Sequence, residues 1–280
     1  MRQHLAAFVV VGIGVLFFSS LVRAQAGQPQ GATPPVKPAP AQAGQPQAAT
    51  PPVKPAPAPP HDLSGIWDSG QKGVLPTTKV VRPPMTPWGQ AKAAEYKPGW
   101  GPREVPVGLT NDPLDSCDPA GFPRDDLFEL RNIQIVQNPN QVLILYEYQR
   151  IWRTIWTDGR EIPKDAEPRW YGYSTGKWVS DDTFVVQTVG MNEKSWLDDE
   201  GDPHSADLKV EERYHRVDHD TIELTVTVDD PKAYTKPWVA IDKLVLKLQP
   251  PTTDIMEMIC VATEALEYKK TMADPAAESK

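Results

Sequence analysis

The chain has 280 residues, with 37 acidic and 29 basic side chains and a formal net charge of −8. An acidic chain of this kind is not expected to bind nucleic acid or anionic membrane surfaces. The composition also shifts along the chain, since an apolar start and a proline-rich stretch precede the part that carries most of the aromatic residues. Only this last part is expected to fold around a core.

The first 24 residues have the pattern of a signal peptide. Arg2 precedes an apolar run from Leu5 to Phe18, and Val22 and Ala24 occupy the small-residue positions before a cleavage site. The run is shorter than the roughly 20 apolar residues that a spanning helix needs. We therefore predict a signal peptide over residues 1–24, with an uncleaved anchor as the alternative. The protein is expected to be periplasmic or secreted, without stable membrane insertion after cleavage.

Residues 25–60 are predicted to form a proline-rich linker. This stretch contains two tandem copies of "AQAGQPQxATPPVKPAP", and the copies differ only at Gly31 and Ala48. Such a composition cannot bury enough apolar surface to offset the entropy of ordering, and its prolines favour an extended, polyproline-like spacer. The alternative is a peptide ligand for a proline-recognition domain. The sequence does not identify the protein partner of this linker.

A single domain is expected over residues 61–267, followed by a frayed tail at 268–280. The two cysteines, Cys117 and Cys260, lie near the ends of this domain. An even pair in an exported chain favours a disulfide, and two buried free thiols are the alternative. Residues 69–127 are rich in Pro and Gly and are expected to form ordered loops. A short helix is predicted over Pro87–Tyr96, with Thr86 as its N-cap.

From Leu130 onward the apolar residues recur with period two, which is typical of β-strands. Short strand-like segments follow one another with tight turns between them, for example "QVLILYEYQ", "RIWRTIWT", "TFVVQTVG" and "IDKLVLKLQ". The segment "TIELTVTV" alternates cleanly between apolar and polar residues. We therefore predict an all-β domain. It should be an antiparallel meander of about eight to ten strands, closed or nearly closed into a barrel, with long Pro-rich loops.

Two charged residues fall on the apolar faces of predicted strands. Glu212 shares a face with Leu208, Val210 and Tyr214, and Arg153 lies between Ile151 and Ile155 in the same phase. An inward carboxylate needs a partner or a raised pKa, so Arg153 and Glu212 are expected to pair. The pair either fixes the strand register or forms the polar floor of a cavity.

An acidic loop, Trp196 to Glu212, carries the candidates for chemistry. Asp198 or Glu212 could orient His204 as a general base, because His has a suitable unperturbed pKa. Asp198, His204 and Glu212 are therefore the predicted catalytic residues. The alternative without a catalytic role is a solvated turn, with His204 capping the next strand.

Other chemistries of this loop have less support in the sequence. His204, Asp198 and Glu212 could ligate a divalent metal, but no metal-site spacing such as H-E-x-x-H or a Cys cluster is present. Ser205 lacks a G-x-S-x-G nucleophile pattern. We therefore predict no metal, and no motif indicates another cofactor. The acidic residues between Asp198 and Pro203 are expected to be solvated.

The aromatic residues are concentrated in the central third of the chain. Trp152, Tyr173, Trp196 and Tyr214, with Arg153, are the predicted ligand-binding residues. Aromatic walls with a few polar groups suit a small apolar or aromatic ligand, and ordinary core packing is the alternative.

Several motifs resemble one family of secreted bacterial proteins of the Acidobacteria type. They include "PPMTPWGQAK", "NDPLDSCDPAGFPR", "WLDDEGDPHS" and "DPKAYTKPW", and the resemblance covers about residues 61–265. The family pattern W-L-D-x-x-G-x-P-H-S matches Trp196, Leu197, Asp198, Gly201 and the run Pro203–Ser205. The resemblance implies no activity. The "SGIW" start is also similar to the short G-x-W opening of lipocalins.

Two functional hypotheses follow. The first is an exported, barrel-like protein that binds a small molecule in an aromatic-lined cavity. The second is a periplasmic hydrolase, lyase or isomerase that uses His204, Glu212 and Asp198 for proton transfer.

Overall fold

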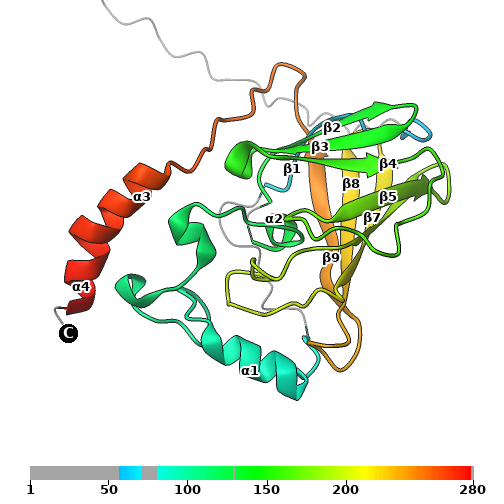
Figure 1. Ribbon diagram of the computed structural model, residues 1–280. Helices are drawn as coiled ribbons and strands as arrows, with labels where there is room; N and C mark the ends of the chain where they lie inside the picture. The colour runs from blue at the N-terminus through cyan, green and yellow to red at the C-terminus, as the bar shows by residue number, and fades with distance from the viewer. Residues whose placement is uncertain (1–56, 71–80, 129, 279–280) are drawn as a thin grey trace, which may run out of the picture. The chain divides into compact units, whose positions relative to one another are not determined.

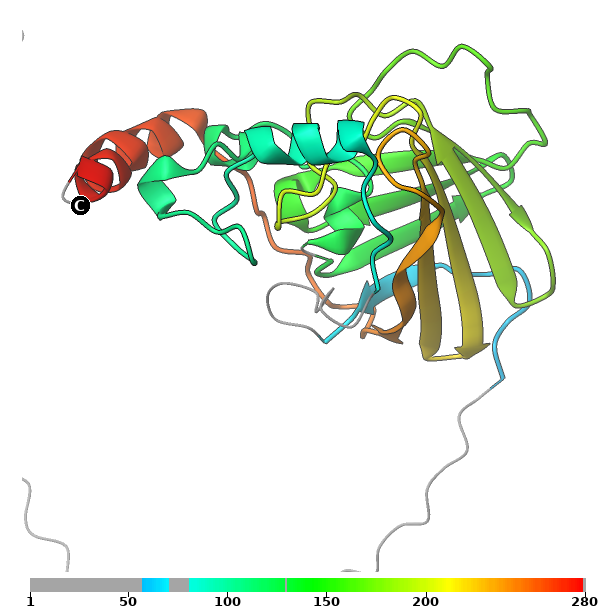
Figure 2. The same cartoon turned by 90° about the horizontal axis from the view of Figure 1, so that it is seen from below.

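The computed structural model describes residues 57–70, 81–128 and 130–278, so the predicted signal peptide and most of the linker lie outside the described residues. Nine strands in this part form a closed barrel (Figures 1 and 2). They are β1 (Gly65–Asp68), β2 (Ile133–Asn138), β3 (Gln141–Tyr146), β4 (Trp152–Trp156), β5 (Tyr173–Trp178), β6 (Thr183–Val189), β7 (Lys209–Asp218), β8 (Thr221–Asp229) and β9 (Trp238–Leu248). The all-β barrel prediction is confirmed.

Each strand pairs with its neighbour in the sequence, and β1 closes the barrel against β9. One pair departs from the predicted antiparallel meander, because β4 and β5 run parallel. A parallel pair needs a long connection that returns the chain to the starting end of the first strand. Residues 157–172 provide that connection, where the sequence suggested a tight turn between successive strands.

The core fills the inside of the barrel with the side chains that the two-residue period places there. In β8, Ile222, Leu224, Val226 and Val228 are all fully buried. In β7, the alternation continues across the register with β8, so that Glu212 faces inward opposite Val226. The predicted inner faces of both strands are therefore confirmed.

Short helices and loops cover one end of the barrel, and α2 lies at this end (Figure 1). The helix α1 (Pro87–Glu95) begins as predicted, since the Thr86 side chain accepts a hydrogen bond of 3.1 Å from the backbone N–H of Gly89. The remaining helical segments are η2 (Val107–Leu109), η3 (Pro113–Ser116), α2 (Arg124–Leu127), η4 (Tyr148–Arg150), α3 (Ala262–Tyr268), the π-helical η5 (Lys269–Ala273) and α4 (Asp274–Glu278).

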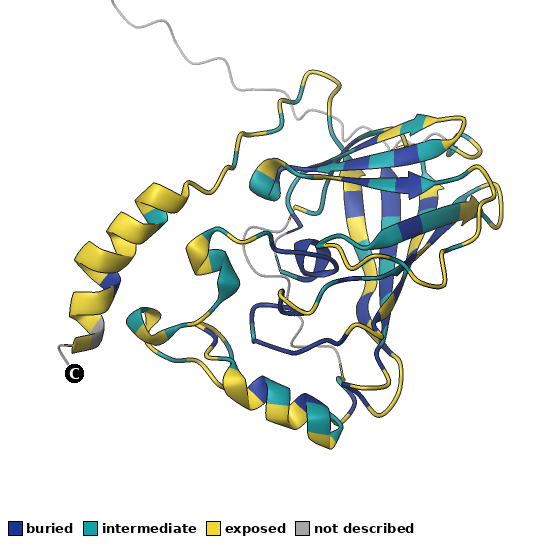
Figure 3. Ribbon diagram, viewed as in Figure 1, coloured by how far each residue is buried: buried dark blue, intermediate teal, exposed yellow. Residues whose placement is uncertain are grey.

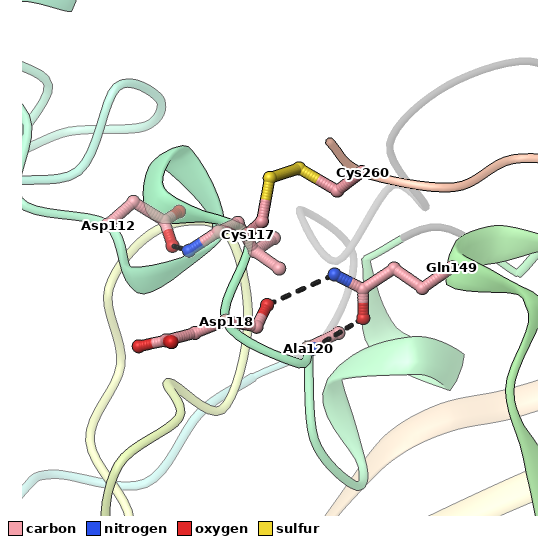
Figure 4. The surroundings of a disulfide bond; sticks show 7 residues. Asp112, Cys117, Asp118, Ala120, Gln149 and Cys260 are labelled. Carbon is pink, nitrogen blue, oxygen red and sulfur yellow. Dashed lines mark hydrogen bonds between the residues drawn. A yellow bond between two sulfur atoms is a disulfide. The ribbon is translucent and has the colours of Figure 1, made fainter. Parts of the chain in front are cut away.

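The predicted disulfide is confirmed. Cys117 and Cys260 are bonded, with Cα atoms 5.4 Å apart, and this bond joins the segment after η3 to the segment before α3 (Figure 4). Beside it, the Gln149 amide donates to the Asp118 carbonyl and accepts from the Ala120 N–H. These links fasten the loop of residues 117–120 to η4.

The C-terminal arm, defined here as α3, η5 and α4, is helical, and η5 and α4 lie in the stretch 268–280 that was expected to be a frayed tail. Its described residues are mostly exposed, whereas α2 is buried throughout (Figure 3). The arm contacts η2 and η3 rather than the barrel wall. None of the described helices is long and apolar enough to cross a membrane.

Candidate functional site

A buried ion pair occupies the inside of the barrel. Arg153 on β4 donates to both carboxylate oxygens of Glu212 on β7, at 3.0 and 2.7 Å. The same guanidinium donates to the hydroxyls of Tyr146, Ser174 and Thr188, at 3.0 to 3.3 Å. Burial lowers the pKa of Arg153, but the charge of Glu212, its hydrogen bonds to Arg153 and the electrostatic interactions with Tyr146 and Asp126 together outweigh this effect, so the pKa is raised overall. The predicted pairing of Arg153 with Glu212 is thus present.

The ion pair is shielded from solvent. The exposed fractions of Arg153 and Glu212 are 2% and 0%, and Tyr214, predicted to bind ligand, donates a 2.7 Å hydrogen bond to Glu212 and is also buried. The Phe122 ring lies 3.5 Å from the guanidinium carbon of Arg153. A substrate has no exposed surface to contact at this pair, so the geometry favours its role in fixing the strands.

Two further carboxyl groups lie beside this pair, on α2. Asp125 and Asp126 are completely buried. The carboxyl oxygens of Asp125 have no hydrogen-bond partner in the described part of the chain, whereas the carboxyl group of Asp126 lies within hydrogen-bonding reach of Tyr146 and Glu212. Burial, and then the charge of Asp126, raises the pKa of Asp125. Burial, and then the charge of Glu212, raises the pKa of Asp126 to about 8. Asp126 is therefore largely protonated at neutral pH, and the pKa of Asp125 is shifted in the same direction.

His204 is held inside the loop that precedes β7. Its Nε2 lies 3.1 Å from the hydroxyl of Ser195, and its Nδ1 lies 3.3 Å from the carbonyl of Ser205. Burial lowers the pKa of His204, so the ring is neutral near pH 7. The next residue, Ser205, donates from its N–H and its hydroxyl to Asp230, which follows β8. These bonds anchor the loop to the end of the barrel.

Arg82 holds the acidic part of this loop. Its guanidinium contacts the carboxylates of Asp198, Glu200 and Asp202 at 2.9, 2.6 and 3.0 Å. Asp198 also accepts from two backbone N–H groups of its own loop. Arg103 donates to the carbonyls of residues 200 and 201. The acidic stretch is therefore a largely buried loop that is held by ion pairs and hydrogen bonds.

The expectation that the acidic residues after Asp198 are solvated is wrong for two of them. Asp199 and Asp202 have exposed fractions of 5% and 4%. Burial, and then the neighbouring Asp198 charge, raises the pKa of Asp199 to about 6 and that of Asp202 to about 7. Sequence reasoning could not see this, because Arg82 lies more than a hundred residues away from the loop that it holds.

The predicted catalytic residues occupy separate environments. Among the described residues, no hydrogen bond or ion pair joins any two of His204, Asp198 and Glu212. Each has its own partners, respectively the two serines, Arg82 and Arg153. Their joint catalytic role stays a prediction, and these separate sets of partners do not support it.

The predicted ligand-binding aromatic residues are also dispersed. Trp196 is buried and stacks on Tyr96 at 5.0 Å, and Tyr173 is half-buried at the start of β5. Trp152 is 66% exposed on the outside of the barrel. It ends a row in which Ile66, Gln134, Leu145 and Trp152 are direct neighbours across β1 to β4, and this row lines an outer pocket of about 490 Å³.

Two other pockets adjoin each other at the loops beside the C-terminal arm. The arm pocket, of about 380 Å³, lies between the arm and η2–η3, with Leu114, Ala265 and Tyr268 among its walls. The Asp199 pocket, of about 270 Å³, is lined by Asp199, Trp100 and Phe128. Both pockets include Val107, Thr110 and Asp115. The two pockets therefore share one wall.

No group of three or more potential ligands that could hold a metal ion is present among the described residues. No protein family, curated protein or solved structure matches the chain. The site must therefore be interpreted from its own geometry.

Proposed function

We propose that the protein is exported and binds a small apolar or aromatic molecule in the arm pocket and the adjoining Asp199 pocket. The export is supported by the predicted signal peptide and by the Cys117–Cys260 disulfide, which is typical of oxidising compartments. The binding is supported by the pockets, which lie outside the barrel because the barrel interior is filled by side chains.

The observation that carries the proposal is the apolar lining of the arm pocket. Val107 on η2, Leu114 on η3 and Val261, Ala265 and Tyr268 at the arm face one space. Val107 and Tyr268 retain exposed fractions of 60% and 55%. Large apolar side chains that stay exposed around a concave surface are a common feature of ligand sites. The disulfide fixes the arm at this position, since Cys260 itself lines the pocket.

The alternative, an acid–base enzyme, has less support. His204 is neutral, buried and bonded within its own loop, and Glu212 is sealed with Arg153 inside the barrel. A general base must reach its proton in a plausible substrate pose, and neither side chain has surface through which to do so.

Filling the arm pocket tests the proposal. Ala265 lines the pocket and Ala262 on the same helix does not, so Ala265→Trp is matched by Ala262→Trp. The neutral fluorescent probe N-phenyl-1-naphthylamine should bind the full protein and the Ala262→Trp variant with similar affinity. Ala265→Trp should weaken binding by about ten-fold or more, equivalent to about 1.4 kcal/mol. Equal binding to both variants, or none to the unmodified protein, would rule the proposal out.

A further inference from the structure

The Asp199 pocket has an unusual wall. Asp199 has an exposed fraction of 5%, and neither of its carboxyl oxygens has a hydrogen-bond partner in the described part of the chain. Buried polar groups are nearly always paired, and each exception needs an explanation. An ionised carboxylate at such a position is stabilised strongly by any cation that approaches it through a medium of low polarity.

The charges around Asp199 leave this carboxylate without a cation of its own. Arg124 on α2 donates to both oxygens of Asp112, at 2.8 and 2.5 Å. Asp115 accepts from Thr110 and adds a further negative charge to the pocket wall. Within its own loop, Asp199 is flanked by Asp198 and Glu200, which are held by Arg82. The pocket is therefore negative overall.

Aromatic rings complete the pocket. Phe128 already has the guanidinium carbon of Arg124 at 5.3 Å from its ring. Trp100 is 55% exposed, and it has no ring or cation–ring contact within the described residues. The face of an indole ring attracts cations, more strongly where water is excluded. Trp100 and Asp199 together thus offer the two interactions that an organic ammonium group uses.

We propose that the Asp199 pocket binds the ammonium group of an amphipathic organic cation whose apolar part lies in the arm pocket. This inference rests on the function proposed above and specifies the chemical class of the ligand. The apolar part would contact Val107, which both pockets share, and extend toward Tyr268. The Asp199 oxygens carry little exposed surface, so a rotation of the Asp199 or Trp100 side chain accompanies binding.

Protons compete with the ligand at this carboxylate. Burial, followed by the charge of Asp198, raises the pKa of Asp199 to about 6, while Arg124 acts in the opposite direction. The other charged groups that face this region are Asp112, Asp115, Asp198, Glu200 and Arg124. Below about pH 6 the carboxyl group is protonated and loses its attraction for a cation.

A pair of probes with the same apolar part tests the proposal. Calorimetric titration of the full protein at pH 7.5 would compare 4-phenylbutylamine, which is cationic, with 4-phenyl-1-butanol, which is neutral. We expect the amine to bind about ten-fold more tightly than the alcohol. If the two bind equally, the cation inference fails while the proposed function stands. If neither binds, both fail.

A charge variant identifies the responsible carboxylate. Asp199→Asn should remove the preference for the amine and leave binding of the alcohol unchanged. The matched control is Asp242→Asn, an exposed position on β9 that carries the same change of charge. For the unmodified protein, the affinity for the amine should fall several-fold between pH 7 and pH 5, and for Asp199→Asn it should stay constant. An unaltered preference or pH profile in Asp199→Asn would overturn the inference.

Discussion

Two clusters of acids around an arginine can be compared within this protein. Inside the barrel, Arg153 faces Glu212, Asp125 and Asp126; in the loop before β7, Arg82 faces Asp198, Glu200 and Asp202. The exposed fraction of the side chain is 1% for Arg153 and 22% for Arg82. Both clusters contain more carboxyl groups than one arginine can neutralise.

The two clusters handle this excess of acid differently. In the barrel, α2 brings Asp125 and Asp126 into a fully buried position, and burial raises the pKa of both carboxyl groups. In the loop, Asp199 remains next to a pocket, and its carboxyl group titrates close to neutral pH. Stable packing explains the barrel cluster. The loop cluster keeps a carboxylate at the edge of a concave surface, which is why we place the binding site there.

The largest effect is expected from breaking the barrel pair. Glu212→Gln leaves the charge of Arg153 buried without an ionised partner, and this should reduce the free energy of unfolding by about 3–5 kcal/mol. Urea denaturation followed by tryptophan fluorescence measures the loss. Glu211→Gln, on the outer face of the same strand, should change it by less than about 0.5 kcal/mol. Similar stability of the two variants would show that the pair contributes little.

The raised pKa of Asp126 on α2 makes the free energy of unfolding depend on pH. Because the pKa of Asp126 is raised to about 8, the folded state keeps a proton that the unfolded state releases near pH 4. This stabilisation is complete below pH 3.8 and is lost as the pH rises toward 8, by about 1.4 kcal/mol per pH unit. Asp126→Asn should lower the slope between pH 4 and 8 by up to about 1.4 kcal/mol per pH unit, as measured by urea titrations, while Asp125, Asp199 and Asp202, whose pKa values are also raised, keep the rest of the dependence. The exposed control Asp118→Asn should retain the original slope. An unchanged slope in Asp126→Asn would contradict the assignment.

A smaller effect is expected in the loop cluster. Arg82→Met removes the cation that contacts three carboxylates, and we expect a loss of about 1–3 kcal/mol in unfolding free energy. The loss should be smaller than for Glu212→Gln because water reaches this arginine. Arg213→Met, on the outer face of β7, is the matched control. If Arg82→Met loses as much unfolding free energy as Glu212→Gln, the two clusters contribute equally to the stability of the fold.

The smallest effect concerns Asp199 and has the opposite sign. Asp199→Asn removes a carboxylate whose folded-state pKa of about 6 is raised by burial, so this variant should be more stable at pH 7. Since the group lies close to the surface, we expect a gain of up to about 1 kcal/mol. Thermal melting at pH 7 should show the gain, and melting at pH 3.5 should not. A loss of stability at pH 7 would mean that Asp199 has a structural partner.

Sequence reasoning succeeded where the relevant period is local. The two-residue alternation placed Glu212 and Arg153 on inner faces, and the strands that carry them then brought the pair together. The Thr86 cap and Pro87 fixed the start of α1 for the same reason. The disulfide followed from the only two cysteines.

Sequence reasoning did not predict the contacts that depend on how the loops pack against one another. The run "PRDD" has no period that distinguishes the buried Asp125 and Asp126 from a solvated turn. The bonds of Arg82 to the acidic loop and the parallel pairing of β4 with β5 depend on tertiary structure alone. The available signals in the sequence were the Pro-rich stretch 69–127 and the acidic loop that starts at Trp196, and neither shows that the two segments are in contact.

Closure of the barrel by its first and last strands has a consequence for how the chain folds. β1 pairs on one side with β2, which begins more than sixty residues later, and on the other with β9, near residue 248. While the chain is synthesised from its N-terminus, β1 is made before β2 and β9 exist, so neither of its edges can pair at first. Contacts between residues so far apart in the sequence slow folding, and unpaired strand edges promote association between chains. Folding of this barrel should therefore be slow, and its early stages should depend on protein concentration.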